Sequence, residues 1–141
     1  MGIKISVIIP AFNSEKYIGN TISSVINQTY ENWELIIVDD CSTDGSLDIV
    51  RKFIDLDERI YLIQSETNFG GPAKPRNIGI NASNGQYIAF LDSDDVWYPE
   101  KLQVCMASFK ESVDILFHDF IKFGNVNIFS KKYLKGKELL K

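Results

Sequence analysis

An acidic segment in the second half of the chain offers the clearest chemistry. Asp92, Asp94 and Asp95 lie within four positions, with Ser93 after the first of them, and we call these four residues the acidic cluster. Carboxylates spaced by one residue after a strand bind hard divalent ions such as Mg²⁺ through one or two oxygens, which leaves coordination positions for water and substrate phosphates. A strand-terminal aspartate can instead cap the next helix, but capping requires only one side chain. The cluster as a whole therefore predicts a metal–diphosphate site.

Two other segments carry polar or aromatic groups directly after apolar runs. Asp39 and Asp40 end a run of branched apolar residues. One of them could cap the helix that follows Ser42, and the other could accept hydrogen bonds from a nucleoside, as an acid near a strand end does for ribose. Phe12, in the segment Pro10–Asn13, could stack on a base or pack inward. Both segments are candidates for the nucleotide side of a binding site.

The loop Asn68–Arg76 combines two glycines and two prolines with Lys74 and Arg76. The planar guanidinium of Arg76 suits phosphate oxygens, although both cations could simply pair with nearby acids. His118 is the only histidine, and beside Asp119 it lacks the further ligands of a metal hydrolase. The sequence has neither a glycine-rich nucleotide loop after its first apolar run nor a nucleophile elbow, so the acidic cluster and this loop are the main candidates.

These candidates follow an alternation of short apolar runs and longer amphipathic ones. The apolar runs predict strands at Ile5–Ile9, Leu35–Val38, Ile60–Ile63, Tyr87–Leu91 and Ile115–Phe117. Apolar residues at helical spacing predict helices from Ser14 to Ile26, from Leu47 to Ile54, from Arg76 to Ala82 and after Pro99. Such alternation predicts an α/β fold, in which a mostly parallel sheet has helices on both faces.

Ligands of such sheets bind at the carboxyl ends of the strands. We therefore expect five carboxylates, those of Asp39, Asp40 and the acidic cluster, to surround one crevice. Like charges arranged in this way repel one another unless a cation or hydrogen-bond donors offset them, which is a second argument for a metal ion.

The composition is that of one soluble globular domain over residues 1–141. Hydrophobic residues make up 45% and charged residues 24%, and the net charge of −4 argues against a nucleic-acid binder. Cys41 and Cys105 are isolated in the sequence, which favours neither a disulfide framework nor a zinc site and fits a cytoplasmic protein. No apolar run approaches the ~20 residues of a membrane-spanning helix.

The end of the chain is basic. Its last eleven residues contain one glutamate, Glu138, and five lysines: Lys131, Lys132, Lys135, Lys137 and Lys141. This pattern is typical of a solvated end, and it would also suit peripheral contact with anionic lipid headgroups. A sheet of this kind leaves its last strand edge unpaired, and a homodimer is one way to protect that edge.

Four motifs in register carry a family likeness. They are Ile5–Asn13, Trp33–Ser46, Asn68–Gly71 with Arg76–Gly79, and Gly85–Asp95. Together they resemble the nucleotide-sugar-binding part of the family 2 glycosyltransferases, which have the GT-A fold. The likeness covers residues 3–119 and leaves residues 120–141 as a basic tail.

The resemblance implies an inverting transfer of a sugar from a nucleotide diphosphate, with a UDP-sugar favoured, to a glycan or lipid-linked acceptor in surface polysaccharide synthesis. It implies Mn²⁺ or Mg²⁺ as the cofactor, with Asp94 as the principal ligand and Asp95 beside it. By position, it implies donor-binding roles for Pro10, Ala11, Phe12, Asn13, Asp40, Asn68, Arg76, Asp92, Ser93 and Asp94.

One part of the family's chemistry has no counterpart in this sequence. In the family, the general base that deprotonates the acceptor hydroxyl lies well beyond the acidic cluster, and Asp119 comes too early to match it. Two hypotheses stay open, a piece of a longer enzyme and a nucleotide-sugar-binding module without turnover. A phosphatase of the haloacid dehalogenase type, with Asp92 as nucleophile, is a third. That class carries its motif after the first strand, whereas here it follows the fourth.

Overall fold

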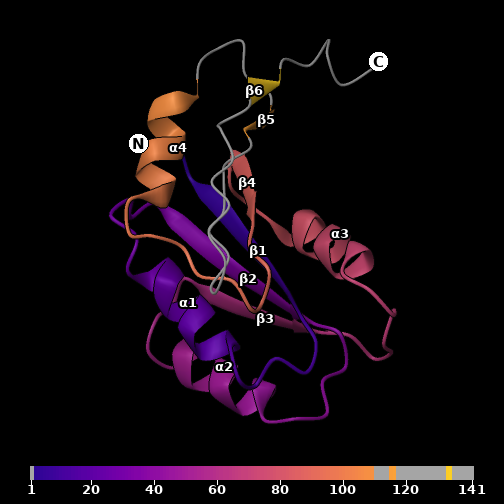
Figure 1. The fold of residues 1–141 in the computed structure, drawn as a ribbon. Coiled ribbons are helices and arrows are strands. Elements are labelled where there is room, and N and C mark those ends of the chain that lie inside the picture. The colour runs from indigo at the N-terminus through magenta and orange to yellow at the C-terminus, as the bar shows by residue number, and fades with distance from the viewer. Residues whose placement is uncertain (1, 110–114, 117–132, 135–141) are drawn as a thin grey trace, which may run out of the picture. The chain divides into compact units, whose positions relative to one another are not determined.

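The computed structural model describes residues 2–109, 115–116 and 133–134 (Figure 1). The chain forms two compact units, Met1–Lys101 and Leu102–Lys141. His118, Asp119 and the lysines of the basic tail lie outside the described residues. In the part of the chain that is described, no helix has the length and apolar character that crossing a membrane requires.

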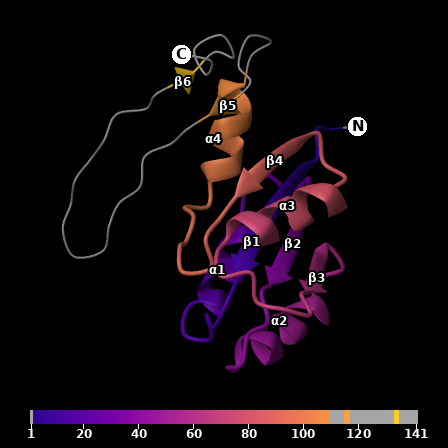
Figure 2. The same cartoon turned by 90° about the vertical axis from the view of Figure 1, so that its right-hand side faces the viewer.

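The first unit is built on a parallel sheet of four strands. Its strands are β1 (Ile5–Ala11), β2 (Trp33–Asp39), β3 (Ile60–Gln64) and β4 (Tyr87–Phe90), in the order β3-β2-β1-β4. The helices between them are α1 (Ile18–Ile26), α2 (Ser46–Ile54) and α3 (Ala73–Ala82). Helices α1 and α2 cover one face of the sheet and α3 covers the other (Figures 1 and 2). The predicted α/β fold and its first four strands are confirmed.

The centre of the sheet explains the apolar runs. Every residue of β1 and β2 is buried, because a parallel strand between helix layers has no solvent-facing side. In the described sheet β4 pairs with β1 alone, and its residues Ile88 and Phe90 are 36% and 46% exposed.

Since all four strands run in the same direction, their carboxyl ends lie at one edge of the sheet. The polar segments identified from the sequence follow the strands at this edge.

Two helices begin at residues other than those predicted. Helix α1 begins at Ile18 rather than Ser14. The carbonyl of Ser14 accepts two backbone hydrogen bonds of 2.9 Å from the first turn, but its hydroxyl has no partner among the described residues, so the side chain is not a cap. Helix α3 begins at Ala73, three residues before Arg76. Pro75 is tolerated there because N–H groups of the first turn need no partner within the helix.

The predicted fifth strand belongs to a second sheet of two strands. The remaining described elements are α4 (Lys101–Ser108), β5 (Ile115–Leu116) and β6 (Tyr133–Leu134). Strand β5 pairs with β6 in antiparallel fashion, with Ile115 opposite Leu134, and the two form a sheet of their own. The predicted strand is therefore present at Ile115–Leu116, and among the described residues it lies outside the four-stranded parallel sheet. A local apolar pattern favours a strand but does not specify the strand with which it pairs.

Helix α3 approaches β1 closely at Gly79. A Cβ atom built at this buried glycine would lie 2.5 Å from Cγ2 of Ile8 and 3.3 Å from its Cγ1. Ile8 is itself fully buried in the sheet. The absence of a side chain at position 79 therefore sets the distance between α3 and the sheet, and Arg76 lies one helical turn earlier on the same helix.

We expect the Gly79→Ala substitution to destabilise the protein by about 1–3 kcal/mol, because the added methyl group overpacks the contact with Ile8. In an Ile8→Ala background the same Gly79→Ala substitution should cost less, because the atoms that clash are absent, although Ile8→Ala is destabilising by itself. The measurement is urea unfolding followed by Trp fluorescence.

Gly19→Ala in α1 is the matched control for this prediction. A Cβ atom at Gly19 would lie 3.5 Å from the nearest atom, of Ile49, which is ordinary contact. Alanine has the higher helix propensity, so this variant should be as stable as the original or more stable by up to about 1 kcal/mol. Equal effects at the two glycines would contradict the close approach at Gly79.

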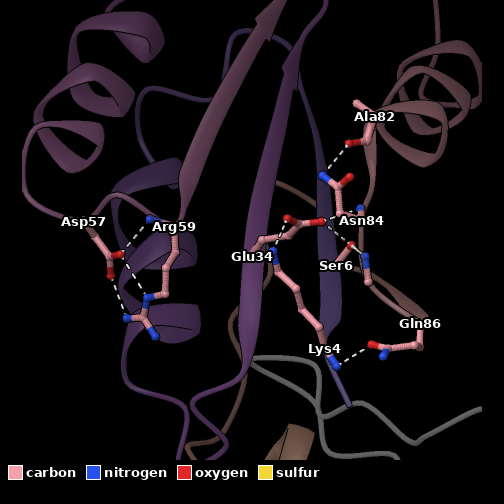
Figure 3. A network of polar contacts seen from close by, with 9 residues as sticks. Lys4, Ser6, Glu34, Asp57, Arg59, Ala82, Asn84 and Gln86 are labelled. Carbon is pink, nitrogen blue, oxygen red and sulfur yellow. Dashed lines mark hydrogen bonds and ion pairs between the residues drawn. The ribbon is translucent and has the colours of Figure 1, made fainter. Parts of the chain in front are cut away.

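At the amino ends of the strands, one buried carboxylate joins three segments (Figure 3). Glu34 of β2 is 2% exposed. Its oxygens accept hydrogen bonds from the hydroxyl of Ser6 at 2.6 Å and from the N–H of Asn84 at 2.7 Å, and they pair with Nζ of Lys4 at 2.6 Å. The N–H of Gly85 donates to the same Ser6 hydroxyl at 2.8 Å. The turn between α3 and β4 is thereby tied to β1 and β2.

Candidate functional site

A cavity of about 390 Å³ lies at the carboxyl ends of the strands. It is lined by Pro10, Ala11, Phe12, Asp40, Asn68, Gly70, Gly71, Pro72, Pro75, Asp92, Ser93 and Asp94. These residues come from the ends of β1 and β2, from the loop after β3, from the start of α3 and from the segment after β4. The structure therefore brings together eight of the ten residues to which the resemblance gives donor-binding roles; Asn13 and Arg76 are not among the lining residues.

The acidic cluster lies at one side of this cavity. Asp92, Ser93 and Asp94 line it, and the N–H of Asp95 donates to the carbonyl of Asp92 at 3.1 Å to close a turn. Burial raises the pKa of Asp95, and the negative charges of Asp94 and Asp92 raise it further. The segment thus concentrates negative charge where a cation or a set of hydrogen-bond donors would offset it.

Arg76 contacts the acidic cluster from α3. Its Nη2 pairs with Oδ1 of Asp92, and the two side chains are 32% and 51% exposed. The guanidinium carbon lies 5.8 Å from the centroid of the Phe90 ring, and the buried Nε has no partner among the described residues. In this structure the arginine therefore holds a carboxylate of the cluster, and it reaches the cavity through Asp92.

Asp40 organises the loop on the other side of the cavity. Its carboxylate is 3% exposed, and both oxygens accept from the N–H of Phe69 at 3.0 Å. Its backbone carbonyl accepts from Nδ2 of Asn68 at 3.0 Å, and Oδ1 of Asn68 accepts from the N–H of Gly70 at 2.7 Å. Gly70 has a φ of 74°, a left-handed conformation that suits glycine. The end of β2 and the loop after β3 therefore form one hydrogen-bonded wall.

Asp39 and Asn13 form hydrogen bonds with neighbouring loop residues and do not line the cavity. Asp39 is 2% exposed, and its Oδ2 accepts from the N–H of Ser42 at 3.0 Å. Oδ1 of Asn13 accepts from the N–H of Thr43 at 2.8 Å, while the N–H of Asn13 donates to Oγ of Ser42 at 2.9 Å. The expected crevice of five carboxylates is therefore lined by three, those of Asp40, Asp92 and Asp94. Alternate residues of a strand end point in different directions, which separates Asp39 from Asp40.

One residue that holds the acidic cluster in place could not be predicted from the sequence. Oγ1 of Thr21, on α1, donates to the carbonyl of Ser93 at 2.9 Å. Thr21 is fully buried and belongs to the same apolar face as Ile18, Ile22 and Val25. From sequence alone it is one more small residue on the core face of a helix, because its partner lies far along the chain.

The acidic cluster is compatible with a divalent ion that a diphosphate helps to hold. Among the described residues, no group of three His, Cys, Asp or Glu side chains is placed to hold a metal ion by itself. Asp92 and Asp94, however, face the same cavity. Mg²⁺ commonly takes one or two protein carboxylates and completes its coordination with water and phosphate oxygens. The carboxylates of Asp92 and Asp94 therefore match, in number and in charge, the protein ligands that Mg²⁺ commonly takes beside a bound diphosphate.

The fold is that of an α/β protein with a cavity at the carboxyl edge of a parallel sheet, the edge at which proteins of this architecture bind their ligands. Residues 6–138 match the family described as Glycosyl transferase family 2, and the chain belongs to this family. Membership sets aside the phosphatase hypothesis.

Three curated relatives show how much of a longer protein the match covers. An uncharacterised glycosyltransferase of Haemophilus influenzae is 48% identical over 99 residues, which are 70% of this chain and 39% of that protein. The poly(ribitol-phosphate) beta-N-acetylglucosaminyltransferase TarS of Staphylococcus aureus is 41% identical over 127 residues, or 88% of this chain and 22% of TarS. WfgD of Escherichia coli, a UDP-Glc:alpha-D-GlcNAc-diphosphoundecaprenol beta-1,3-glucosyltransferase, is 37% identical over 134 residues, or 94% of this chain and 49% of WfgD. The chain thus spans less than half the length of each.

Solved structures agree with the fold. The crystal structure of TarS 1-349 in complex with UDP-GlcNAc superposes with a TM-score of 0.71 at 42% sequence identity, and covers 74% of this chain and 30% of that one. The mannosyltransferase PcManGT from Pyrobaculum calidifontis, solved with GDP-Man and Mn²⁺, gives a TM-score of 0.71 at 22% identity over 80% of this chain and 34% of that one. The second likeness concerns the fold alone.

Proposed function

We propose that the cavity binds a nucleotide-diphosphate sugar, with a UDP-sugar favoured, as the donor for an inverting transfer to a hydroxyl of a glycan or lipid-linked acceptor in cell-surface polysaccharide synthesis. The observation that carries the proposal is the cavity itself, which joins the Asp40 wall to the acidic cluster at the carboxyl edge of the sheet. The names of TarS and WfgD support the donor and acceptor classes.

The two sides of the cavity suit the two ends of such a donor. Phe12, which is 50% exposed, offers an aromatic face beside Asp40 for the base. Asp92, Ser93 and Asp94 lie where the diphosphate would reach, and Mn²⁺ or Mg²⁺ held there would offset its charge. We assign Asp94 as the principal metal ligand, because Arg76 already pairs with Asp92.

The reaction exchanges one bond to the sugar for another. The bond between the anomeric carbon and the phosphate oxygen breaks, and the acceptor oxygen forms a new bond on the opposite face of that carbon. The electron pair leaves with the diphosphate. A divalent ion held by Asp94 would supply a Lewis acid to offset that charge. The acceptor proton passes to a general base, and we assign no residue of this chain to that role.

Titration calorimetry with UDP, with and without Mn²⁺, tests the proposal. We expect UDP to bind the chain and Mn²⁺ to tighten the binding about tenfold or more, equivalent to ~1.4 kcal/mol. A donor-hydrolysis assay on UDP-GlcNAc and UDP-glucose, in the same buffer, reports whether the chain also turns donor over.

The outcomes separate the two hypotheses that the sequence leaves open. Metal-dependent binding with turnover supports an enzyme whose residues suffice for chemistry. Metal-dependent binding without turnover supports a donor-binding module or a piece of a longer enzyme. The absence of UDP binding, or UDP binding that Mn²⁺ does not tighten, would overturn the proposal.

A further inference from the structure

Helix α1 and the residues just after it hold the segment that follows β4 by side-chain hydrogen bonds to backbone carbonyls. Oγ1 of Thr21 donates to the carbonyl of Ser93 at 2.9 Å, and Nε2 of Gln28 donates to the carbonyl of Tyr98 at 2.8 Å. Both donors are buried, Thr21 fully and Gln28 with 5% exposed. The segment that carries the acidic cluster is therefore attached at two points, to α1 through Thr21 and to the residues just after α1 through Gln28.

The contact with Ser93 bears directly on the acidic cluster. The carbonyl of Ser93 belongs to the peptide group that joins Ser93 to Asp94. A hydrogen bond to that oxygen fixes the orientation of the planar peptide, and so restricts the backbone torsions next to it. Asp92, on the other side of Ser93, is paired with Arg76 of α3. The carboxylate of Asp92 and the Ser93–Asp94 peptide are thus held from helices on opposite faces of the sheet (Figure 1).

Packing alone does not account for a hydroxyl at position 21. The neighbouring buried residues of the same helix face are Ile18, Ile22 and Val25. Within its own helix, Oγ1 of Thr21 lies 3.3 Å from the carbonyl of Tyr17, a longer contact than the one to Ser93. A valine would fill the same space, but it would leave the carbonyl of Ser93 without this donor.

We propose that Thr21 is a positioning residue for the acidic cluster: its hydroxyl orients the Ser93–Asp94 peptide so that Asp94 can share a divalent ion with a bound diphosphate. This inference rests on the proposed function, because it concerns the metal-dependent part of UDP binding. It assigns Thr21 no contact with donor or metal.

The test compares Thr21→Val, which removes the hydroxyl and keeps the shape, with Thr21→Ser, which keeps the hydroxyl. The readout is the ratio of the UDP dissociation constants measured without and with Mn²⁺. For Thr21→Val we expect this ratio to fall about 3- to 10-fold, the range that one lost hydrogen bond supports, while metal-free UDP binding stays within about twofold. Thr21→Ser should keep the original ratio.

Ile22→Val is the control for stability, because it shortens a neighbouring buried side chain that has no polar group with which to bond to the cluster. Its ratio should be unchanged although its melting temperature falls. A second measurement needs only the folded protein without ligand. The amide of Asp94, bonded to the Ser93 carbonyl carbon, should shift in the NMR spectrum of Thr21→Val more than in that of Ile22→Val. If Thr21→Val does not fold, Thr21→Ala serves in both measurements.

The failure of this inference can be told apart from the failure of the proposed function. If the unmodified chain shows no Mn²⁺-dependent gain in UDP affinity, the proposed function fails before any variant is compared. If it shows the gain and the variants that lack the hydroxyl retain it, or if Ile22→Val loses it equally, Thr21 has no positioning role.

Discussion

The Asp94→Ala variant is expected to bind UDP in the presence of Mn²⁺ at least about tenfold more weakly than the unmodified chain, equivalent to ~1.4 kcal/mol, because it loses the gain in affinity that the ion supplies. Asp94 faces the cavity, and Asp92 beside it is already paired with Arg76, so Asp94 is the carboxylate left to take a metal ion. Without Mn²⁺, UDP should bind the variant as well as the unmodified chain or slightly better, because a negative charge near the diphosphate is removed. Calorimetry with and without Mn²⁺ measures both quantities.

Asp48→Ala is the matched control for this prediction, since it removes the same charge at a site away from the cavity. Asp48 lies on α2, and its side chain is 79% exposed in an ion pair with Arg51. This variant should bind UDP and Mn²⁺ as the unmodified chain does, because isolated surface pairs contribute little. Equal weakening by the two substitutions, or no weakening by Asp94→Ala, would show that Asp94 is not the metal ligand.

The Glu34→Ala variant is expected to lose about 3 kcal/mol of its free energy of unfolding. The substitution removes a buried carboxylate and leaves the hydroxyl of Ser6 and the N–H of Asn84 without that acceptor. Lys4, which is 36% exposed, can turn to solvent, and this holds the loss at the lower end of the range for a broken buried pair. Urea unfolding, followed by Trp fluorescence, measures the difference.

The pH dependence of the free energy of unfolding tests the role of Glu34 in a second way. Burial opposes the charge of Glu34, but the hydrogen bonds from Lys4, Ser6 and Asn84 outweigh it, so its pKa lies below the ordinary value of 4.5. The unfolded chain therefore binds its proton first as the pH falls. The stabilisation is fully present above pH 4.5 and is lost as the pH drops through the lowered pKa of the folded state.

Glu34→Gln is the control, because it keeps the shape of the side chain and does not titrate. Its free energy of unfolding should fall less steeply below pH 4.5 than that of the unmodified chain. In both proteins the lowered pKa values of Asp44 and Asp57 still contribute to the loss of stability in acid. Identical slopes, or a Glu34→Ala variant as stable as the original, would contradict the role assigned to Glu34.

Much of the fold follows from local patterns. Buried parallel strands require continuous branched apolar residues, and the runs at Ile5–Ile9 and Leu35–Val38 supply them. Once the strands are parallel, the residues after them must lie at one edge. Asp39, Asp40 and the acidic cluster could therefore be assigned to one crevice from the sequence, and four of these residues, Asp40, Asp92, Ser93 and Asp94, line one cavity.

What the sequence could not decide depends on contacts between distant residues. Glu34 looks like a surface acid in an apolar run, yet it is buried because Ser6 and Asn84 approach it from other segments. Thr21 looks like a core position, yet its hydroxyl holds Ser93. The partner of β5 is likewise a later segment of the chain.

The sequence by itself determined which residues of this family 2 glycosyltransferase carry charge and which elements precede them, because both depend on spacing along the chain. The tertiary structure alone decided the direction in which each charge points. Asp39 faces its own loop, Asp40 holds the wall of the cavity and Asp92 pairs with Arg76. These differences arise from hydrogen bonds whose partners are known only when the chain is folded.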